Sequence, residues 1–194
     1  MSAEVGQKVR PRERILETAR DLFHRNGIRA VGVDAIAEAA GTNKMTLYRH
    51  FGSKDDLVAE CLRSVACEGD ALWRDLEARF SDDKRGQLQG WIREIAGRIT
   101  ADSRGCDLAN AAVELTEPDH PARRVVEEFK MHNRNRLAAL CREAGVARPE
   151  ILADTLLLLV EGARVSRQSI GENGPGDRFP ELAQAVIAGF TGDR

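Results

Sequence analysis

Apolar residues recur along this chain of 194 residues at the three- and four-residue spacing of helices. No stretch alternates apolar and polar residues in the way that a half-buried strand does. The first apolar stripe contains Ile15, Ala19, Leu22 and Phe23, and it stops at Asn26-Gly27, a helix C-terminal signal. The pattern therefore predicts an amphipathic first helix that ends at this glycine.

Three further helix starts can be read from the residues that follow. A short second helix is predicted between Gly32 and Gly41, with its apolar residues facing inward. Asn43 can cap a third helix, in which Leu47 and Phe51 lie four residues apart on one face. These two helices and their glycine turn have the layout of a helix-turn-helix.

A long fourth helix is expected to begin with a capping box and to continue to about residue 80. Ser53 and Asp56 have the spacing of that box. The sequence "GENGPGDR" at 171–178 predicts a loop. The later apolar stripes predict helices near 86–101, 106–116, 121–144, 149–170 and 180–190.

These patterns predict an all-α fold with two parts. Residues 1–54 would form a three-helix head that contains the helix-turn-helix, and residues 55–194 would form a helical body. The long fourth helix would belong to both parts, so the connection between them would be rigid.

Composition narrows the class of protein. Apolar residues make up 42% and charged residues 31%, and no apolar run approaches the roughly 20 residues of a membrane span. The polar N-terminus does not have the form of an export signal, which predicts a cytoplasmic protein. The four cysteines have no metal-site spacing and are expected to be reduced thiols. We predict no metal, no other cofactor and no membrane contact.

Charge is distributed unevenly along the chain. Residues 1–54 contain ten Lys or Arg and six Asp or Glu, whereas the whole chain has a net charge of −2. The head therefore carries +4 and the remainder −6. A basic head on an acidic body favours contact between the head and a polyanion.

The sequence "GTNKMTLYRHF" concentrates donor groups on the third predicted helix. With Leu47 turned inward, Lys44, Met45, Tyr48 and Arg49 point outward, an arrangement that suits the DNA major groove. Phosphate contacts are expected from Thr42, Thr46, His50 and Lys54. The alternative is that this charged helix is only a solvated surface, which leaves the glycine turn and the packing helix unexplained.

The segment "VDAIAEAAGTNKMTLYRHFGSKDDL" resembles the DNA-binding head of the TetR family of bacterial transcriptional regulators. The resemblance covers about residues 11–60. It implies base or groove contacts from Lys44, Met45 and Tyr48, and phosphate contacts from the four residues named above. Members usually carry Thr or Ser at the start of the second helix, where this chain has Gly32-Val33-Asp34, so one phosphate contact is in doubt.

A single small head binds DNA weakly, so we expect the body to form a homodimer that reads a palindromic operator. The resemblance implies a four-helix contact between subunits. The predicted interface residues come from the last two helices, although an ordinary core position would explain the same apolar residues: Leu152, Leu156, Leu159, Ala163, Leu182 and Val186.

The middle of the body offers a place for a small-molecule effector. Cys106, Asn110 and Glu114 fall on one helix face, and Trp91, Met131 and His132 are predicted to line the same cavity. The alternatives are that Asn110 is a cap, that Trp91 belongs to the core and that His132 lies on the surface.

Together these features predict a ligand-responsive, homodimeric repressor that leaves double-stranded DNA when a small molecule binds the body. No catalytic constellation is recognisable, so an enzyme is not expected. Two other classes remain open at this point: an effector-independent DNA-binding protein, and a helical small-molecule carrier that does not bind DNA.

Overall fold

The computed structural model describes residues 10–191, which contain nine α-helices, one 3₁₀ turn and no strand. The predicted all-α fold is confirmed. The elements are α1 (Pro11–Asn26), α2 (Val33–Ala39), α3 (Lys44–Phe51), α4 (Lys54–Arg79), α5 (Lys84–Ala101), α6 (Asp107–Glu114), α7 (Pro121–Glu143), α8 (Pro149–Ile170), η1 (Pro175–Arg178) and α9 (Phe179–Thr191). None of the described helices is both long and apolar enough to cross a membrane.

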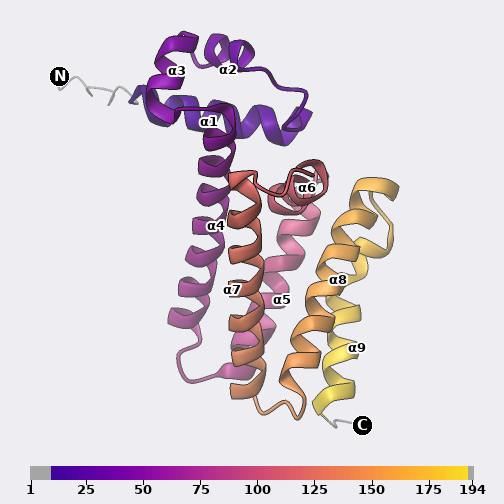
Figure 1. The fold of residues 1–194 in the computed structure, drawn as a ribbon. Coiled ribbons are helices and arrows are strands. Elements are labelled where there is room, and N and C mark those ends of the chain that lie inside the picture. Colours follow the sequence, from indigo (N-terminus) through magenta and orange to yellow (C-terminus); the bar gives the residue numbers. More distant parts are fainter. Residues whose placement is uncertain (1–9, 192–194) are drawn as a thin grey trace, which may run out of the picture.

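Local sequence signals explain where the first helices begin and end. Helix α1 starts at a proline and ends at Gly27, whose φ of 84° favours a residue without a side chain. The Asn43 side chain accepts a hydrogen bond from the N–H of Thr46 at the start of α3, and Ser53 accepts one from Asp56 at the start of α4. Helices α1, α2 and α3 form the head (Figure 1).

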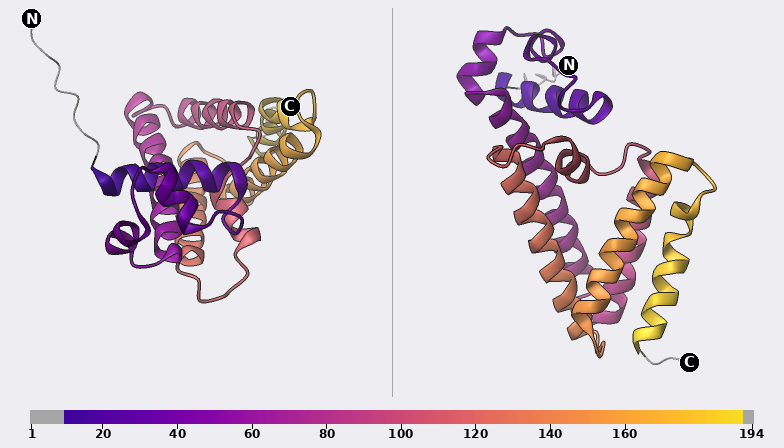
Figure 2. Two further views of the ribbon diagram at one scale, coloured as in Figure 1. Left: turned by 90° about the horizontal axis from the view of Figure 1, so that it is seen from above. Right: turned by 45° about the vertical axis from the view of Figure 1, so that its right-hand side comes forward.

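The long helix α4 leaves the head and enters the body. It packs mainly against α7, and α7 packs in turn against α8. Helices α4, α5, α7, α8 and α9 run along the length of the body, whereas the short α6 lies at the end that faces the head (Figures 1 and 2). The body is thus an arrangement of long helices with one short helix between it and the head.

The apolar core has two parts, and they do not separate at residue 54. The first joins the head to the upper part of α4, to α6 through Leu108 and Ala111, and to the start of α7 through Val125. The second fills the rest of the body, around Trp91 and Leu152. Head and body therefore share buried side chains, and the boundary predicted at residue 54 stays a prediction.

The segment predicted as a loop at 171–178 contains the short turn η1. It passes very close to α8, because a Cβ added at Gly176 would lie 2.5 Å from the carbonyl oxygen of Ala163. Glycine at this position lets the chain turn back tightly and places α9 beside α8 (Figure 2).

Candidate DNA-recognition and ligand-binding sites

Helix α3 turns one face into the head and the other outward. Leu47 is fully buried and Phe51 nearly so. On the opposite face Met45 is 82% exposed, Tyr48 39% exposed, and Lys44 is also open to solvent. Arg49 continues this outer face, so the four predicted groove-facing side chains lie together on one exposed surface of α3.

The remaining predicted DNA-contacting residues lie around this surface. Thr42, Thr46 and His50 are half-buried at its edges. Lys44 forms a salt bridge of 3.2 Å with Asp34, and both side chains are more than half exposed. This exposed pair is weak in water, so it leaves the Lys44 ammonium available to a stronger anion.

Lys54 has a different environment from the one predicted. Its ammonium donates a hydrogen bond of 2.6 Å to the carbonyl oxygen of Ile28 and lies 5.9 Å from the centre of the Phe23 ring. These contacts join the start of α4 to the end of α1 inside the head. The structure thus gives Lys54 a stabilising contact within the protein, and the phosphate contact expected from the sequence stays a prediction.

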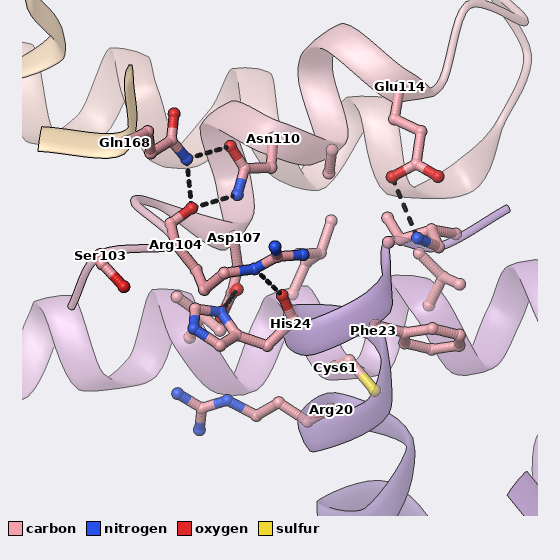
Figure 3. Close-up of a pocket in the computed structure, with 16 residues that line it drawn as sticks. Arg20, Phe23, His24, Cys61, Ser103, Arg104, Asp107, Asn110, Glu114 and Gln168 are labelled. Carbon is pink, nitrogen blue, oxygen red and sulfur yellow. Dashed lines mark hydrogen bonds and ion pairs between the residues drawn. The ribbon is translucent and has the colours of Figure 1, made fainter. Parts of the chain in front are cut away.

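A pocket of about 350 Å³ lies where the head meets the body, between α1, α4 and α6 (Figure 3). Its floor is apolar and includes Phe23, and its rim is polar. At this rim the His24 ring binds Asp107 through one nitrogen and lies 3.2 Å from Asp102 through the other. Burial lowers the pKa of His24, but the two carboxylates outweigh that effect and the pKa is raised.

Glu114 at the end of α6 makes a second link between body and head. Its carboxylate accepts hydrogen bonds from the backbone N–H groups of Ile28 and Arg29, at 3.0 and 2.6 Å. Figure 3 shows this side chain reaching from α6 to the chain that follows α1. Both N–H groups come just after the end of α1, where no helical carbonyl oxygen accepts them, and the Glu114 carboxylate serves as their acceptor.

The other polar side chains of the pocket also have partners. Asn110 donates to the carbonyl oxygen of Arg104 at 2.8 Å and accepts from Gln168 of α8 at 3.3 Å (Figure 3). The Arg104 guanidinium donates to the carbonyl oxygens of His24 and Arg25 in α1. The segment from 102 to 114 therefore contacts both the head and α8.

A second, mostly apolar cavity of about 520 Å³ lies between helices of the body and reaches its surface, because exposed side chains such as Leu158 and Met131 line it. Residues from α4, α5, α6, α7 and α8 line it, and they include both tryptophans of the chain, Trp73 and Trp91. The two indole rings are stacked, with centres 6.5 Å apart. The Trp73 N–H donates to Asn133 at 2.8 Å, so the polar edge of this ring is satisfied, and the Arg136 guanidinium lies 5.1 Å from the centre of the same ring.

The outer surface of α8 is apolar. Ile151, Leu158 and Val165 are 53%, 73% and 60% exposed, and they recur every seven residues, so they lie on one face. Gly162 on the same helix and Gly189 on α9 would each accept a Cβ without meeting any atom within 4 Å. This strip of apolar side chains and open glycines is where another helix can approach closely.

Comparison with known proteins places these sites in context. Residues 15–61, which contain α2 and α3, match the family model described as "Bacterial regulatory proteins, tetR family". The fold of SCO4454, a TetR-family transcriptional regulator from Streptomyces coelicolor, superposes with a TM-score of 0.83 and 28% identity over 94% of this chain and 95% of that one. The chain belongs to the TetR family.

Curated relatives of this TetR-family chain match over part of their length. The HTH-type transcriptional repressor KstR2 of Rhodococcus jostii is 29% identical over 56% of this chain and 49% of its own length. The HTH-type transcriptional activator FasR of Mycolicibacterium smegmatis is 33% identical over 55% of this chain and 48% of its own length. The chain thus spans about half the length of the curated relatives it matches. One of these two relatives is named a repressor and the other an activator.

The structure of this TetR-family chain divides the predicted ligand residues among three places. Trp91, Cys106 and Met131 line the body cavity, whereas Asn110 and Glu114 line the pocket beneath the head. His132 lines neither and lies on the surface, 3.6 Å from Asp70. The three residues Cys106, Asn110 and Glu114 were predicted to share one helix face, but Cys106 is the N-cap of α6 and lines the body cavity, whereas the other two line the pocket beneath the head.

The predicted interface residues are likewise split between core and surface. Leu152 and Leu156 are fully buried, which leaves them no surface for a second subunit, and Ala163 is 8% exposed. Leu159 and Val186 are half-buried, and Leu182 is 41% exposed. The exposed strip of Ile151, Leu158 and Val165 was not predicted. It comes from the same apolar helix, one residue or two away from the positions chosen.

Proposed function

We propose that this protein is a DNA-binding transcriptional regulator that acts as a homodimer on a palindromic operator. The observation that carries the proposal is the outer face of α3, where Lys44, Met45, Tyr48 and Arg49 are exposed beside a buried Leu47. An exposed helix of this kind enters the major groove and reads base edges through its side chains. Membership of the TetR family supports the same assignment.

Within this proposal the side chains of α3 have different roles. Lys44 leaves Asp34 for a guanine or phosphate acceptor, and Met45 makes apolar contacts with a thymine methyl group or a sugar. Thr42, Thr46 and His50 bind phosphates at the edges of the groove. Lys54 would have to leave the carbonyl oxygen of Ile28 to bind a phosphate, as Lys44 would have to leave Asp34.

The exposed strip on α8, together with Leu182 of α9, is the surface that we assign to dimerisation. Two copies packed through this strip would bury the apolar side chains and bring the open glycines together, forming a four-helix contact. A dimer doubles the number of phosphate and base contacts and thereby raises affinity and specificity.

The body cavity is the proposed effector site, and the links through α6 are the proposed route to the head. A ligand that favours a different position of α6 acts on Glu114 and Asp107, which hold the end of α1. DNA is released only in so far as the ligand binds the DNA-free arrangement more tightly than the DNA-bound one. Release of DNA makes the protein a repressor where the operator overlaps a promoter, and we expect a cytoplasmic location.

Selection of DNA fragments from a random pool by the purified protein tests this function. The expected outcome is a palindrome whose half-sites are separated by about one helical turn or a multiple of it. Enrichment of no sequence, or of a site without symmetry, would contradict the proposal.

Point variants then test the role of α3. Lys44→Ala and Tyr48→Phe should each weaken binding to the selected site by about tenfold, measured by gel shift. Arg74→Ala, which removes an exposed charge from the body, is the matched control and should leave affinity unchanged. Equal losses in all three variants would show that α3 does not read the DNA.

A further inference from the structure

The charged side chains around the body cavity carry an excess of positive charge. Four basic and two acidic residues line it, which gives a formal charge of +2: Arg98, Lys130, Arg134, Arg164, Asp154 and Glu161. All other lining residues are uncharged, and most of them are apolar. An apolar cavity with such an excess is selective for the charge of its ligand.

Two of the four basic residues form ion pairs with the two acidic residues. Arg134 of α7 binds Asp154 of α8 through two N–H groups, at 2.6 and 2.8 Å. Lys130 of α7 binds one carboxylate oxygen of Glu161 of α8 through its ammonium group. These pairs hold α7 to α8, and each carboxylate already has its own cation. The acidic residues are therefore poor partners for a cationic ligand.

The excess comes from Arg98 of α5 and Arg164 of α8. Within residues 10–191, neither guanidinium makes a hydrogen bond or a salt bridge. The carboxylate of Glu68 interacts electrostatically with Arg98 but is bound by both terminal nitrogens of Arg20. Both arginines thus keep a full set of donors for a ligand.

The position of these arginines points to one end of the cavity. Arg98 is in the last turn of α5, and Arg164 is within two turns of the end of α8 at Ile170. Both helix ends lie at the end of the body that faces the head (Figure 2). Trp73 and Trp91, which are 3% and 1% exposed, line the same cavity together with apolar side chains such as Phe129.

We propose that the ligand of this cavity is an amphiphilic carboxylic acid, with its carboxylate on Arg98 and Arg164 and its apolar part against the tryptophans. Guanidinium groups bind carboxylates through paired hydrogen bonds, and these strengthen when the ligand displaces water from an apolar site. This inference rests on the proposed function of the cavity as the effector site. It adds the class of ligand and its orientation, with the acid group nearest to α6.

A series of three probes with the same ten-carbon chain tests the charge of the ligand. Decanoate, decan-1-ol and decylamine carry an anionic, a neutral and a cationic head. Both tryptophans of the chain line the cavity, so intrinsic fluorescence reports entry of each probe. Circular dichroism recorded in parallel verifies that the helices are retained. Decanoate is expected to bind at least about tenfold more tightly than the other two.

Variants of the two arginines test the site itself. Arg98→Gln and Arg164→Gln should each lower affinity for decanoate by about tenfold while leaving affinity for decan-1-ol unchanged. Arg93→Gln is the matched control, because Arg93 is an exposed arginine of the same helix α5 that does not line the cavity. It should bind all three probes as the unmodified protein does.

The outcomes separate this inference from the function on which it rests. Saturable binding of decan-1-ol or decylamine as tight as that of decanoate would overturn the assignment of an acid, yet leave the cavity as a ligand site. If both arginine variants still preferred decanoate, the assignment of an acid would likewise be overturned and the cavity would remain a ligand site. Binding of none of the three probes would overturn the inference, while DNA selection would still stand as the separate test of DNA binding.

Discussion

The link between Glu114 and the end of α1 leads to a prediction that can be worked through in numbers. Glu114→Ala removes the acceptor of two backbone N–H groups, those of Ile28 and Arg29. A hydrogen bond to a charged partner contributes about 1.5–3 kcal/mol. Ile28 is buried, so its N–H would be left without a partner, whereas the N–H of Arg29 is exposed and would be solvated by water. We therefore expect a loss of about 2–3 kcal/mol in the free energy of unfolding.

Thermal unfolding followed by circular dichroism measures this loss. For a chain of this length about 2–4 °C of Tm corresponds to each kcal/mol, so Tm should fall by roughly 5–10 °C. Glu117→Ala is the matched control, because Glu117 pairs with the side chain of Arg29 in an exposed position and should leave Tm unchanged. Both variants must be compared at one protein concentration, since association also raises Tm. A Tm for Glu114→Ala equal to that of the control would refute the role of Glu114 as a link.

Three more predictions follow from described contacts. The aspartates raise the pKa of His24 in the folded protein. Its contacts therefore stabilise the fold fully below the unfolded pKa of about 6.5, and this stabilisation is lost as the pH rises through the folded pKa. His24→Asn should accordingly cost more stability in urea unfolding at about pH 6 than at about pH 8. Leu158→Asp should convert a dimer to monomers in light scattering, whereas Val113→Asp, at an even more exposed position on α6, should not. Gly69→Ala would place a Cβ 2.6 Å from an aromatic ring of α7 and should lower stability by about 1–3 kcal/mol, while Gly97→Ala has open space and should not lower it.

The helices could be predicted closely because their signals are local. Caps such as Asn43 and Ser53, and the glycine at 27, lie within a few residues of the helix ends that they determine. The exposed face of α3 followed in the same way, because Leu47 and Phe51 set the rotation of a short amphipathic helix. In these regions residue spacing alone carried the structural information.

The dimer strip shows where spacing carries too little information. Helix α8 contains four consecutive leucines at 156–159, so apolar residues occur around much of its circumference. Periodicity cannot then distinguish Leu156, which is buried in the body, from Leu158, which is 73% exposed. The choice depends on how α8 packs against α7 and α9, which are distant in the sequence.

The pocket beneath the head was outside the reach of sequence patterns for a related reason. His24 meets Asp107 across 83 positions of the chain, and Glu114 meets Ile28 across 86. No short motif relates these residues. The sequence predicted Glu114 as a pocket residue but gave no sign of its contact with the head, and it gave His24 no role at all.

The apolar core shared between the head and α6 sets a limit on protein engineering. A chimeric regulator that exchanged only residues 1–54 would join foreign side chains to Leu108, Ala111 and Val125, which pack in the same cluster as the native head. Such a graft would leave voids or clashes at the seam. A working exchange of DNA specificity has to include the matching half of α4 and the facing residues of α6 and α7, or else replace only the outward side chains of α3.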